Sequence, residues 1–410
     1  MPGPFDGIRI IDLTAMVSGP LATMTLADQG ADVIKVEAPN GGDHARHVAT
    51  RRGGFAAAFL NNNRNKRSII IDLKSKDGLD VFLRLAKDAD VVIQNFRPGV
   101  ADRIGVGEDA LRELNPRLIH VSISGFGFDG PYSQKPVFDP LIQAVSGLTT
   151  VQAGSDQERP RLVRTILPDK LTGIQTSQAI SAALFARERS GEGQAIKISM
   201  LDTVVAFLWS SDMGSHTFVG IEPETERAQS FIDLIYETAD GYASIAVMQD
   251  KEWRGLAKAL NKPEFLEDER FKTTTLRGGK YKDDRMNLTQ DAVRHFTTDE
   301  LIAVLEAEDV PCAPVLTRRQ MRHHPQIAAN ETLFETDHPT AGPIRQARQP
   351  AQFSKTPNEH RFGAPVYGEH TREILSEAGW ADTDIDALEA SGAVRQGSPD
   401  QPQDQSGAAE

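Results

Sequence analysis

The stretch IRIIDLTAMVSGPLATMTLADQGADVIKVE, residues 8–37, decides the fold. Its first part, Ile8 to Leu13, is apolar and rich in β-branched residues, which predicts a buried strand. The loop TAMVSGP interrupts it, and the residues from Leu21 to Asp28 are expected to form a helix that ends before Gly30. A second apolar strand follows from Asp32 to Val36. The stretch therefore predicts a strand, a helix and a parallel strand.

The same alternation continues along the next ninety or so residues. Strands are expected at Ser68 to Leu73, Asp90 to Gln94 and LIHVSISGF (118–126), with helices at Gly78 to Ala86 and around Gly107 to Leu114. Such alternation predicts a mostly parallel, Rossmann-like sheet with helices on its faces. Ligands of these sheets bind beyond the carboxyl ends of the strands. The loops TAMVSGP, KVEAPNGGD, NFRPG and SGFG are therefore the candidate ligand-binding loops.

Two positions mark the start of the first helix. Ser18 is the residue type that most often caps a helix, and Pro20 comes early, where its missing N–H costs little. Further on, Asp169 precedes a long helical stretch that Gly191 is expected to end, and the strand IKISM (196–200) follows. Residues 1–224 are predicted to form the first part of the large α/β domain.

The character of the sequence changes near residue 225. LIYETADGYASIAV reads as two strands joined at Asp240–Gly241, and TTDE at 297–300 is a capping box that starts a helix. We therefore expect a smaller α+β domain at 225–325. A proline-rich segment at 326–392 is predicted to return to the large domain and complete it, with a short helix from His370 to Ala378. The polar residues 393–410 predict a disordered tail.

The composition excludes several classes of protein. The 410 residues carry a net charge of −13, which argues against a nucleic-acid-binding protein, because phosphates require a basic face. No apolar run approaches the roughly 20 residues that span a bilayer, so we expect no membrane association. The start MPGPFDGIRI does not resemble a signal peptide, and the single cysteine, Cys312, fits a reducing compartment. The prediction is a cytoplasmic protein.

Motifs of several common enzyme classes are missing. The absence of GxGxxG argues against a nicotinamide enzyme, although Glu37 ends the second strand where a ribose-binding acid would stand. The absence of GxSxG argues against a common hydrolase type, and the histidines include no HExxH pair, so no metal site is expected. Cys312 lies among prolines and apolar residues, which predicts an inert thiol.

Basic residues gather in the first part of the chain despite the negative net charge. They are Arg46, Arg51, Arg52, Arg64, Lys66, Arg67, Arg97 and Arg103. The cluster is compatible with an ordinary charged surface. Because several members lie in or near the candidate loops, it also predicts the binding of an anionic ligand.

Asp169, in LPDKLTG, has two interpretations. The structural one is an N-cap aspartate that accepts hydrogen bonds from the first turn of its helix. The functional one uses the same geometry, because a carboxylate at a helix N-terminus stays ionised and can attack a thioester. Gly173 and the SGFG loop would leave space for an acyl group and for backbone N–H donors that stabilise the oxyanion.

The order and spacing of several stretches make a family recognisable. The stretches are GIRIIDLTAMVSGPLATMTLADQGADVIKVEAP with GGDHAR, NRNKRSIIIDLK, NFRPGVADRIG, NPRLIHVSISGFGFDGPY, QAVSGL, LPDKLTG with ALFARERSGEGQAIKISMLD, VPCAPV and APVYGEHTREIL. The sequence resembles the class III CoA-transferases, the group that contains formyl-CoA transferase, carnitine CoA-transferase and α-methylacyl-CoA racemase. The resemblance extends to about residue 380.

The resemblance implies roles for particular residues. Asp169 falls on the catalytic aspartate, which would form an anhydride and then a CoA thioester. The residues that would hold CoA are Val17, Ser18, Ile71, Lys74, Asn95, Phe96, Arg97, Val100, Arg103 and Met200. Arg97 and Arg103 would pair with the nucleotide phosphates, and Phe96 would lie against the adenine. The resemblance also implies an acyl-CoA and a carboxylic acid as substrates, no tightly bound cofactor, and two chains interlocked like the rings of a chain.

Two departures from the family pattern bear on the substrate. Ala15 and Val17 replace a polar pair of the formyl-CoA transferases, and the small domain lacks their glycine run, so oxalate is not expected as acceptor. In PVFDPLIQA, Phe138 and Asp139 stand in the segment where racemases carry a histidine, and we assign them to substrate contact. An α-methylacyl-CoA racemase and a non-catalytic CoA-binding protein remain the alternatives to a transferase. If Asp169 were only a cap, Asp139 or Glu37 would be the next candidate carboxylate.

Overall fold

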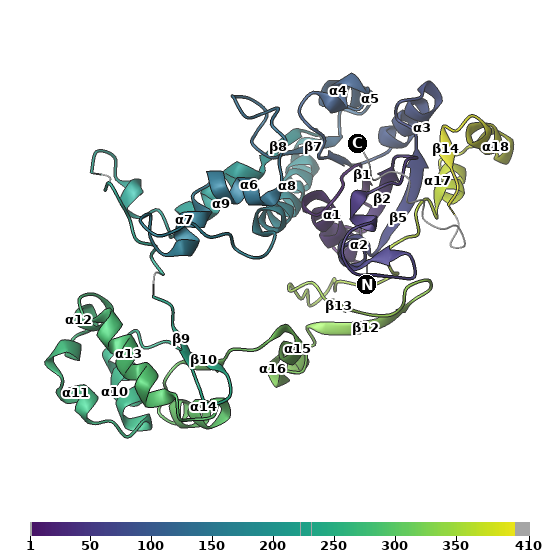
Figure 1. The fold of residues 1–410 in the computed structure, drawn as a ribbon. Coiled ribbons are helices and arrows are strands. Elements are labelled where there is room, and N and C mark those ends of the chain that lie inside the picture. Colours follow the sequence, from purple (N-terminus) through teal and green to yellow (C-terminus); the bar gives the residue numbers. More distant parts are fainter. Residues whose placement is uncertain (1, 222, 231, 398–410) are drawn as a thin grey trace. The chain divides into compact units, whose positions relative to one another are not determined.

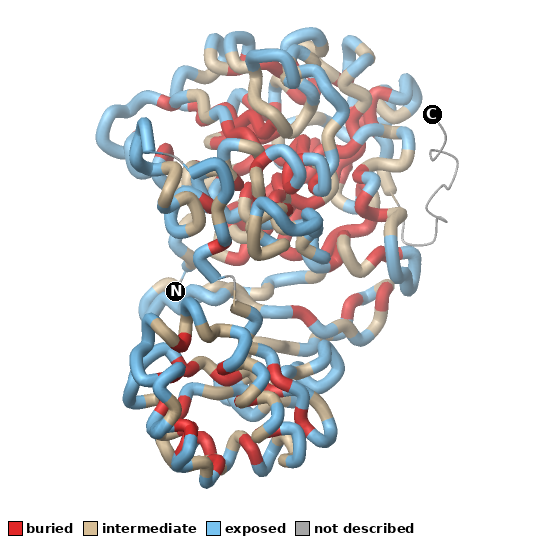
Figure 2. Tube along the Cα trace, turned by 60° about the vertical axis from the view of Figure 1, so that its left-hand side comes forward, coloured by how far each residue is buried: buried red, intermediate tan, exposed pale blue. Residues whose placement is uncertain are grey.

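The chain folds into two compact units. The computed structural model describes residues 2–221, 223–230 and 232–397. One unit comprises Met1–Gln229 and Leu333–Glu410, and the other comprises Ser230–Thr332 (Figure 1). Each unit has its own cluster of buried apolar side chains. In Figure 2 many buried residues of the larger unit, in red, gather in its interior. None of the helices in these described residues is both long and apolar enough to cross a lipid bilayer.

A seven-stranded sheet forms the centre of the larger unit, in the order β14-β5-β2-β1-β6-β7-β8. The strands are β1 (Arg9–Asp12), β2 (Asp32–Glu37), β5 (Lys66–Ile71), β6 (Val91–Gln94), β7 (Ile119–Ser124), β8 (Ala195–Ser199) and β14 (Val394–Arg395). All neighbours pair in parallel except β14, which is antiparallel to β5. The predicted parallel α/β sheet is therefore confirmed. The expected strands differ from the observed ones only at their ends, and β14 was not expected.

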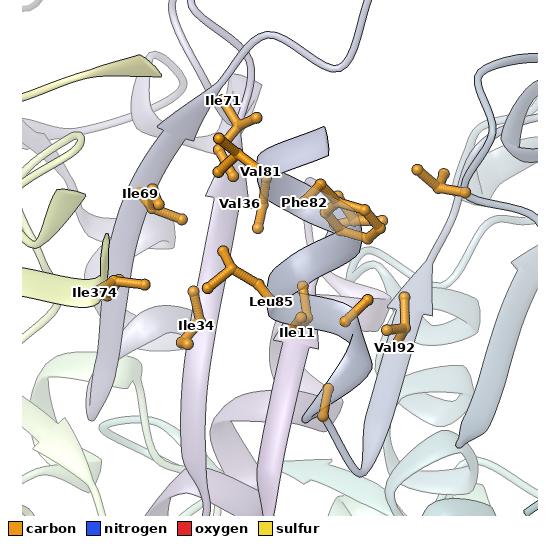
Figure 3. Close-up of a cluster of buried hydrophobic side chains, with 14 of the residues drawn as sticks. Ile11, Ile34, Val36, Ile69, Ile71, Val81, Phe82, Leu85, Val92 and Ile374 are labelled. Carbon is orange, nitrogen blue, oxygen red and sulfur yellow. The ribbon is translucent and has the colours of Figure 1, made fainter. Parts of the chain in front are cut away.

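Helices cover both faces of this sheet. One face packs against α3 (Lys76–Lys87), α5 (Glu108–Leu114), α17 (Thr371–Glu377) and α18 (Asp382–Ala390), and the other against α1 (Ser18–Asp28) and α8 (Leu167–Ser190). Figure 3 shows the first face, where Val81, Phe82 and Leu85 of α3 pack with the apolar side chains of the sheet, and Leu85 lies by Ile11 and Ile34. These three side chains recur at helical spacing, so one side of α3 is apolar. Truncating a fully buried phenylalanine such as Phe82 to alanine costs about 3–5 kcal/mol.

The helices α1 and α8 lie in close contact. A Cβ atom at Gly173 of α8 would lie 2.8 Å from the carbonyl oxygen of Ser18 and 3.1 Å from the side chain of Leu21. Gly173 therefore allows the two backbones to approach, and it does not leave space for an acyl group, contrary to the expectation from sequence. Ser18 is the first residue of α1 and makes no cap bond within it, while Val17 occupies the N-cap position. The N-cap prediction for Ser18 was wrong.

Shorter elements complete the larger unit. They are β3 (Arg51–Arg52), β4 (Phe55–Ala56), α2 (Ala57–Asn63), α4 (Val100–Arg103), α6 (Asp139–Val145), α7 (Leu148–Ala153) and α9 (Met200–Trp209), with 3-10 turns at His44–Arg46 and Ser215–Thr217. Ile142 of α6 and Val204 of α9 are fully buried in one apolar cluster with Leu148 of α7. This cluster supports the region in which α8 begins.

The smaller unit is an α+β fold. Its strands β9 (Ile235–Glu237), β10 (Tyr242–Ile245) and β11 (Cys312–Pro314) form an antiparallel sheet in the order β11-β10-β9. Its helices are α10 (Asp250–Ala259), α11 (Glu264–Glu267), α12 (Thr274–Gly278), α13 (Lys282–Val293), α14 (Thr298–Glu306), α15 (Arg318–Met321) and α16 (Pro325–Ala329), with a 3-10 turn at Glu269–Phe271. The hairpin at Asp240–Gly241 and the capping box at Thr297 are both present.

The last part of the chain returns to the larger unit. It opens with the hairpin β12 (Leu333–His338) and β13 (Gly342–Ala347), continues to α17 and α18, and ends with β14. Ala393 and Val394 are buried, and Val394 pairs with Ile71 of β5. The prediction of a disordered tail was therefore wrong for its first residues, because apolar side chains and a strand edge of the sheet hold them. Residues 398–410 lie outside the described part of the chain.

Candidate active site

Asp169 is the third residue of α8, not its N-cap. The helix begins at Leu167, Ile166 occupies the N-cap position, and Pro168 lies in the first turn. The cap interpretation of Asp169 was therefore wrong. The stretch was misread because Leu167 and Pro168 also adopt helical geometry, which a proline permits in the first turn.

The carboxylate of Asp169 lies at the N-terminus of another helix. Ser18, the first residue of α1, donates hydrogen bonds from its backbone N–H and its hydroxyl to this carboxylate. Burial and the nearby charge of Asp139 outweigh these bonds and raise the pKa of Asp169 to about 6. At neutral pH the group is mostly ionised, but it is more basic than an exposed aspartate. A carboxylate with these properties can act as a nucleophile.

Asp139, the first residue of α6, is the second carboxylate of the site. It is buried, its Oδ1 accepts from Gln143 Nε2 at 2.7 Å, and its Oδ2 accepts from the backbone N–H of Asp169 at 3.3 Å. Burial also raises the pKa of Asp139. Both oxygens are engaged by neighbouring donors, so Asp139 holds the start of α8 and raises the basicity of Asp169.

The two carboxylates line a cavity of about 180 Å³. Of the residues assigned to the site from sequence, this cavity brings together Ser18, Asn95, Phe96, Arg97, Phe138, Asp139, Asp169 and Met200. Phe126 and Val137 add apolar surface, and Lys135 adds a positive charge. Phe138 is 72% exposed, so it lies at an open side of the cavity.

A second cavity, of about 510 Å³, lies at the carboxyl ends of β1, β2 and β5. It contains the remaining predicted CoA contacts Ile71, Lys74, Val100 and Arg103, together with Phe96. Phe96 therefore lines both cavities, and the two form adjacent parts of one site. Val17 lines neither cavity and is buried before α1, so the structure does not bring it to the others.

Half of the basic cluster noted in the sequence forms ion pairs that stabilise the fold. Buried ion pairs join Arg46 to Glu37, Arg64 to Asp28 and Lys66 to Asp12, and the half-buried Arg67 pairs with Asp32. Glu37 also accepts a hydrogen bond from the Ser68 hydroxyl, so this acid is not available to a ribose. Arg97 lines the smaller cavity and Arg103 lines the larger one.

The structure also shows functional neighbours that the sequence did not single out. Lys35 and Asp43 form a buried ion pair with 2.8 Å between Nζ and Oδ2, directly behind the loop that precedes α1. Asp43 belongs to the GGDHAR stretch that carried part of the family resemblance, but no motif assigns it a role.

Cys312 is half-buried in β11, and burial raises the pKa of its thiol, in line with an inert side chain. No metal-ligating cluster of His, Cys, Asp and Glu occurs among the residues that the structure describes.

Comparison with known proteins identifies the family. A family model described as CoA-transferase family III matches residues 5–371. The chain belongs to this family. This CoA-transferase is 33% identical to a succinate–glutarate CoA-transferase of Agrobacterium fabrum over 385 residues, covering 91% of this chain and 95% of the relative. It is 30% identical to the human succinyl-CoA:glutarate CoA-transferase over 401 residues, covering 96% and 90%.

Solved structures agree with this assignment. The CoA-transferase superimposes on the crystal structure of a CAIB/BAIF family protein from Brucella suis with a TM-score of 0.82 and 31% identity, covering 92% of this chain and all of that one. The cavities described above therefore belong to an enzyme that uses CoA thioesters as substrates.

Proposed function

We propose that this CoA-transferase moves CoA from an acyl-CoA donor to a carboxylic acid through a covalent intermediate on Asp169. The observation that carries the proposal is the position of the Asp169 carboxylate. It lines the smaller cavity, it has a pKa raised to about 6, and it is oriented by two donors of Ser18. These are the properties of a carboxylate that can attack a thioester and form a mixed anhydride.

In the proposed reaction the Asp169 carboxylate carries each covalent intermediate in turn. An oxygen of Asp169 attacks the thioester carbonyl, forms a mixed anhydride and releases the CoA thiolate. The thiolate attacks the Asp169 carbonyl of the anhydride, which releases the donor acid and leaves an aspartyl CoA thioester. The acceptor carboxylate attacks this thioester, and the CoA released attacks the acceptor side of the new anhydride. The second acyl-CoA leaves and the Asp169 carboxylate is restored.

The other two carboxylates considered from sequence are less suited to this chemistry. Asp139 is 4% exposed and has both oxygens engaged by neighbouring donors. Glu37 lines the larger cavity and is held by Arg46 through two hydrogen bonds, at 2.6 and 2.8 Å. An attack by either group would first require the loss of several charge-assisted hydrogen bonds.

The larger cavity is proposed to hold the nucleotide part of CoA. Lys74 and Arg103 line it and can pair with phosphates, while Ile71 and Val100 supply apolar contacts. Phe96 lies where the two cavities meet, so the thioester end would extend past it toward Asp169. Asn95, Arg97 and Met200 would contact the ligand on the side of the smaller cavity.

The acceptor acid is proposed to be larger than oxalate. Ala15 and Val17 replace the polar pair that formyl-CoA transferases carry in the first turn, and this replacement carries the proposal. Sequence identity does not choose the acid, because relatives named for glutarate, D-citramalate and oxalate all share 30–33% identity with this chain. Glutarate, succinate and citramalate are the first acids to test, with a fatty acid as the contrasting class, because another relative is named a probable fatty acyl-CoA transferase.

We also propose that two copies of the chain assemble into an interlocked dimer. Large apolar side chains of α8 and α9 are exposed in the single chain, among them Ile174, Phe185, Phe207 and Trp209. Exposed apolar residues on adjacent helices are typical of surfaces that bind another protein. The molar mass in solution tests this assembly, and an interlocked pair should not dissociate on dilution.

An exchange assay tests the proposed reaction. Succinyl-CoA is incubated with each free acid, succinate being isotope-labelled, and the new acyl-CoA is measured by mass spectrometry for the wild type and Asp169→Asn. Exchange by the wild type and its loss in Asp169→Asn support the proposal. A parallel reaction with a chiral 2-methylacyl-CoA in deuterated water tests the racemase alternative, since deuterium at C2 without CoA exchange contradicts a transferase. Binding of CoA without either reaction indicates a binding protein.

A further inference from the structure

The loop between β1 and α1 contains a strained residue beside the reaction centre. Met16 has a φ of 71°, in the left-handed region that side chains other than glycine rarely adopt. Such a conformation is unfavourable and persists only where neighbouring groups enforce it. Ser18, which donates to Asp169, follows two residues later. The conformation of Met16 therefore sets the direction in which α1 begins.

A buried ion pair from another part of the chain enforces this conformation. Oδ1 of Asp43 accepts from the backbone N–H of Met16 at 2.9 Å. Oδ2 of Asp43 pairs with Lys35 Nζ at 2.8 Å, and both side chains are at most 1% exposed. The same Lys35 Nζ donates to the carbonyl oxygen of Thr14 at 2.8 Å. The pair thus holds the loop on both sides of Ala15.

The neighbouring residue Ala15 is fixed as well. Asn95 accepts from its backbone N–H at 3.0 Å and donates to its carbonyl oxygen at 2.9 Å. Asp12 accepts from the backbone N–H of Thr14 at 2.9 Å. The loop is therefore held by side chains at three consecutive residues, and the cation and anion behind it are shielded from water, where their interaction is strong.

We propose that the Lys35–Asp43 ion pair positions the reaction centre: it holds Met16 in the left-handed conformation and thereby directs the N–H and hydroxyl of Ser18 toward the Asp169 carboxylate. Lys35 and Asp43 are positioning residues, since neither lies against Asp169. This role presupposes that Asp169 is the nucleophile, as proposed above. It gives a function to a costly pair of buried charges behind this loop.

Asp43→Asn tests this role. Asparagine keeps an oxygen for the N–H of Met16 but removes the charge that pairs with Lys35. We expect kcat to fall by about 100-fold, more than KM changes, because a displacement of about 1 Å at the reacting group has an effect of this size. The acid limb of the pH profile of kcat should move to higher pH, since the bonds from Ser18 lower the pKa of Asp169.

The pH profile is specific because the other charged groups near Asp169 are untouched. These are Asp139 on α6, Lys170 on α8, and Arg97 and Lys135 in the loops that line the same cavity. Asp28→Asn is the matched control. Asp28 ends the same helix that Ser18 begins, and it forms a buried ion pair with Arg64 at 2.7 Å. This control should lose stability to a similar extent without a shift of the acid limb.

Rescue by glycine completes the test. Because glycine adopts a positive φ at little cost, Met16→Gly should restore part of the kcat lost in Asp43→Asn and return the acid limb toward that of Met16→Gly alone. If Asp43→Asn does not fold, Lys35→Gln removes the other half of the pair and should shift the same limb. If Asp169→Asn is inactive, two results overturn the positioning role: an acid limb that Asp43→Asn leaves unshifted, or an equal shift of that limb in Asp28→Asn. Exchange by Asp169→Asn would instead overturn the proposed function itself.

Discussion

Ser18, the first residue of α1, hydrogen-bonds through its backbone N–H and its hydroxyl to the carboxylate of Asp169, the third residue of α8. The two residues meet because Gly173 lets α8 approach the backbone of α1. The positive end of α1 favours the ionised carboxylate, whereas burial and Asp139 favour the protonated one. The balance leaves Asp169 ionised but basic at neutral pH, as covalent catalysis by a carboxylate requires.

Removing the hydroxyl of Ser18 should weaken catalysis. In Ser18→Ala the backbone N–H still donates to Asp169, so we expect kcat to fall by about 10- to 100-fold rather than to vanish. The acid limb should also move to higher pH, because one of the two bonds that lower the pKa of Asp169 is lost. Ser181→Ala is the control, since the hydroxyl of Ser181 donates to the Ser177 carbonyl within α8. Equal effects of both changes would contradict the role of Ser18.

Activity should depend on the ionisation of Asp169. Its pKa is raised to about 6, and only the ionised form attacks a thioester. We therefore expect kcat to be constant at neutral pH and to fall about tenfold per pH unit below about pH 6. Measurement of kcat with a saturating acyl-CoA between about pH 5 and 8 checks this. A limb near pH 4 would indicate an unperturbed carboxylate.

Asp169→Asn should be more stable than the wild type at neutral pH. The folded pKa lies above the ordinary value of 3.8, so the folded state binds more protons between these values and loses stability as pH rises through this window. A shift of about two pKa units corresponds to at most about 3 kcal/mol. Chemical unfolding at about pH 7.5 should show an increase toward this limit, absent below about pH 4. Asp129→Asn, in an exposed loop, is the control, and a destabilised Asp169→Asn contradicts the account.

Basic residues of the larger cavity should contribute to binding rather than to chemistry. We expect Arg103→Gln to raise KM for the acyl-CoA by about tenfold, with little change in kcat, because an exposed phosphate contact is made equally before and during the reaction. The increase should shrink at high salt. Arg112→Gln, which removes a surface pair with Glu108, serves as the control. A fall in kcat at unchanged KM would place Arg103 at the reaction centre instead.

The sequence predicts the sheet well because its strands are short apolar runs separated by loops. The stretch 8–37 gives β1, α1 and β2 nearly as the structure shows them, and each later strand follows the same pattern. The C-terminal strand β14 was missed, since Val394 and Arg395 are too few to show a period. Such a short strand exists because the edge of β5 is available to pair with it.

The sequence predicted which residues belong to the candidate site, but not how they contact one another. Asp169 and most of the CoA contacts came from the family pattern, and two cavities contain nearly all of them. That Ser18 donates to Asp169 could not be predicted, because 151 residues separate them and only the packing of α1 on α8 joins them. The Lys35–Asp43 pair was hidden for another reason. Lys35 lies inside an apolar strand and Asp43 lies in a loop, so no sequence motif relates the two residues. Only the folded structure brings their side chains together.

The covalent intermediate tests the central claim most directly. The enzyme is incubated with an acyl-CoA donor and hydroxylamine, digested, and analysed by peptide mass spectrometry. An anhydride or CoA thioester on Asp169 should be converted to a hydroxamate at this residue, and the peptide from Asp169→Asn should remain unmodified. A hydroxamate at Asp139 or Glu37, or none at all while the wild type exchanges CoA at its normal rate, would contradict the assignment of Asp169 as the nucleophile.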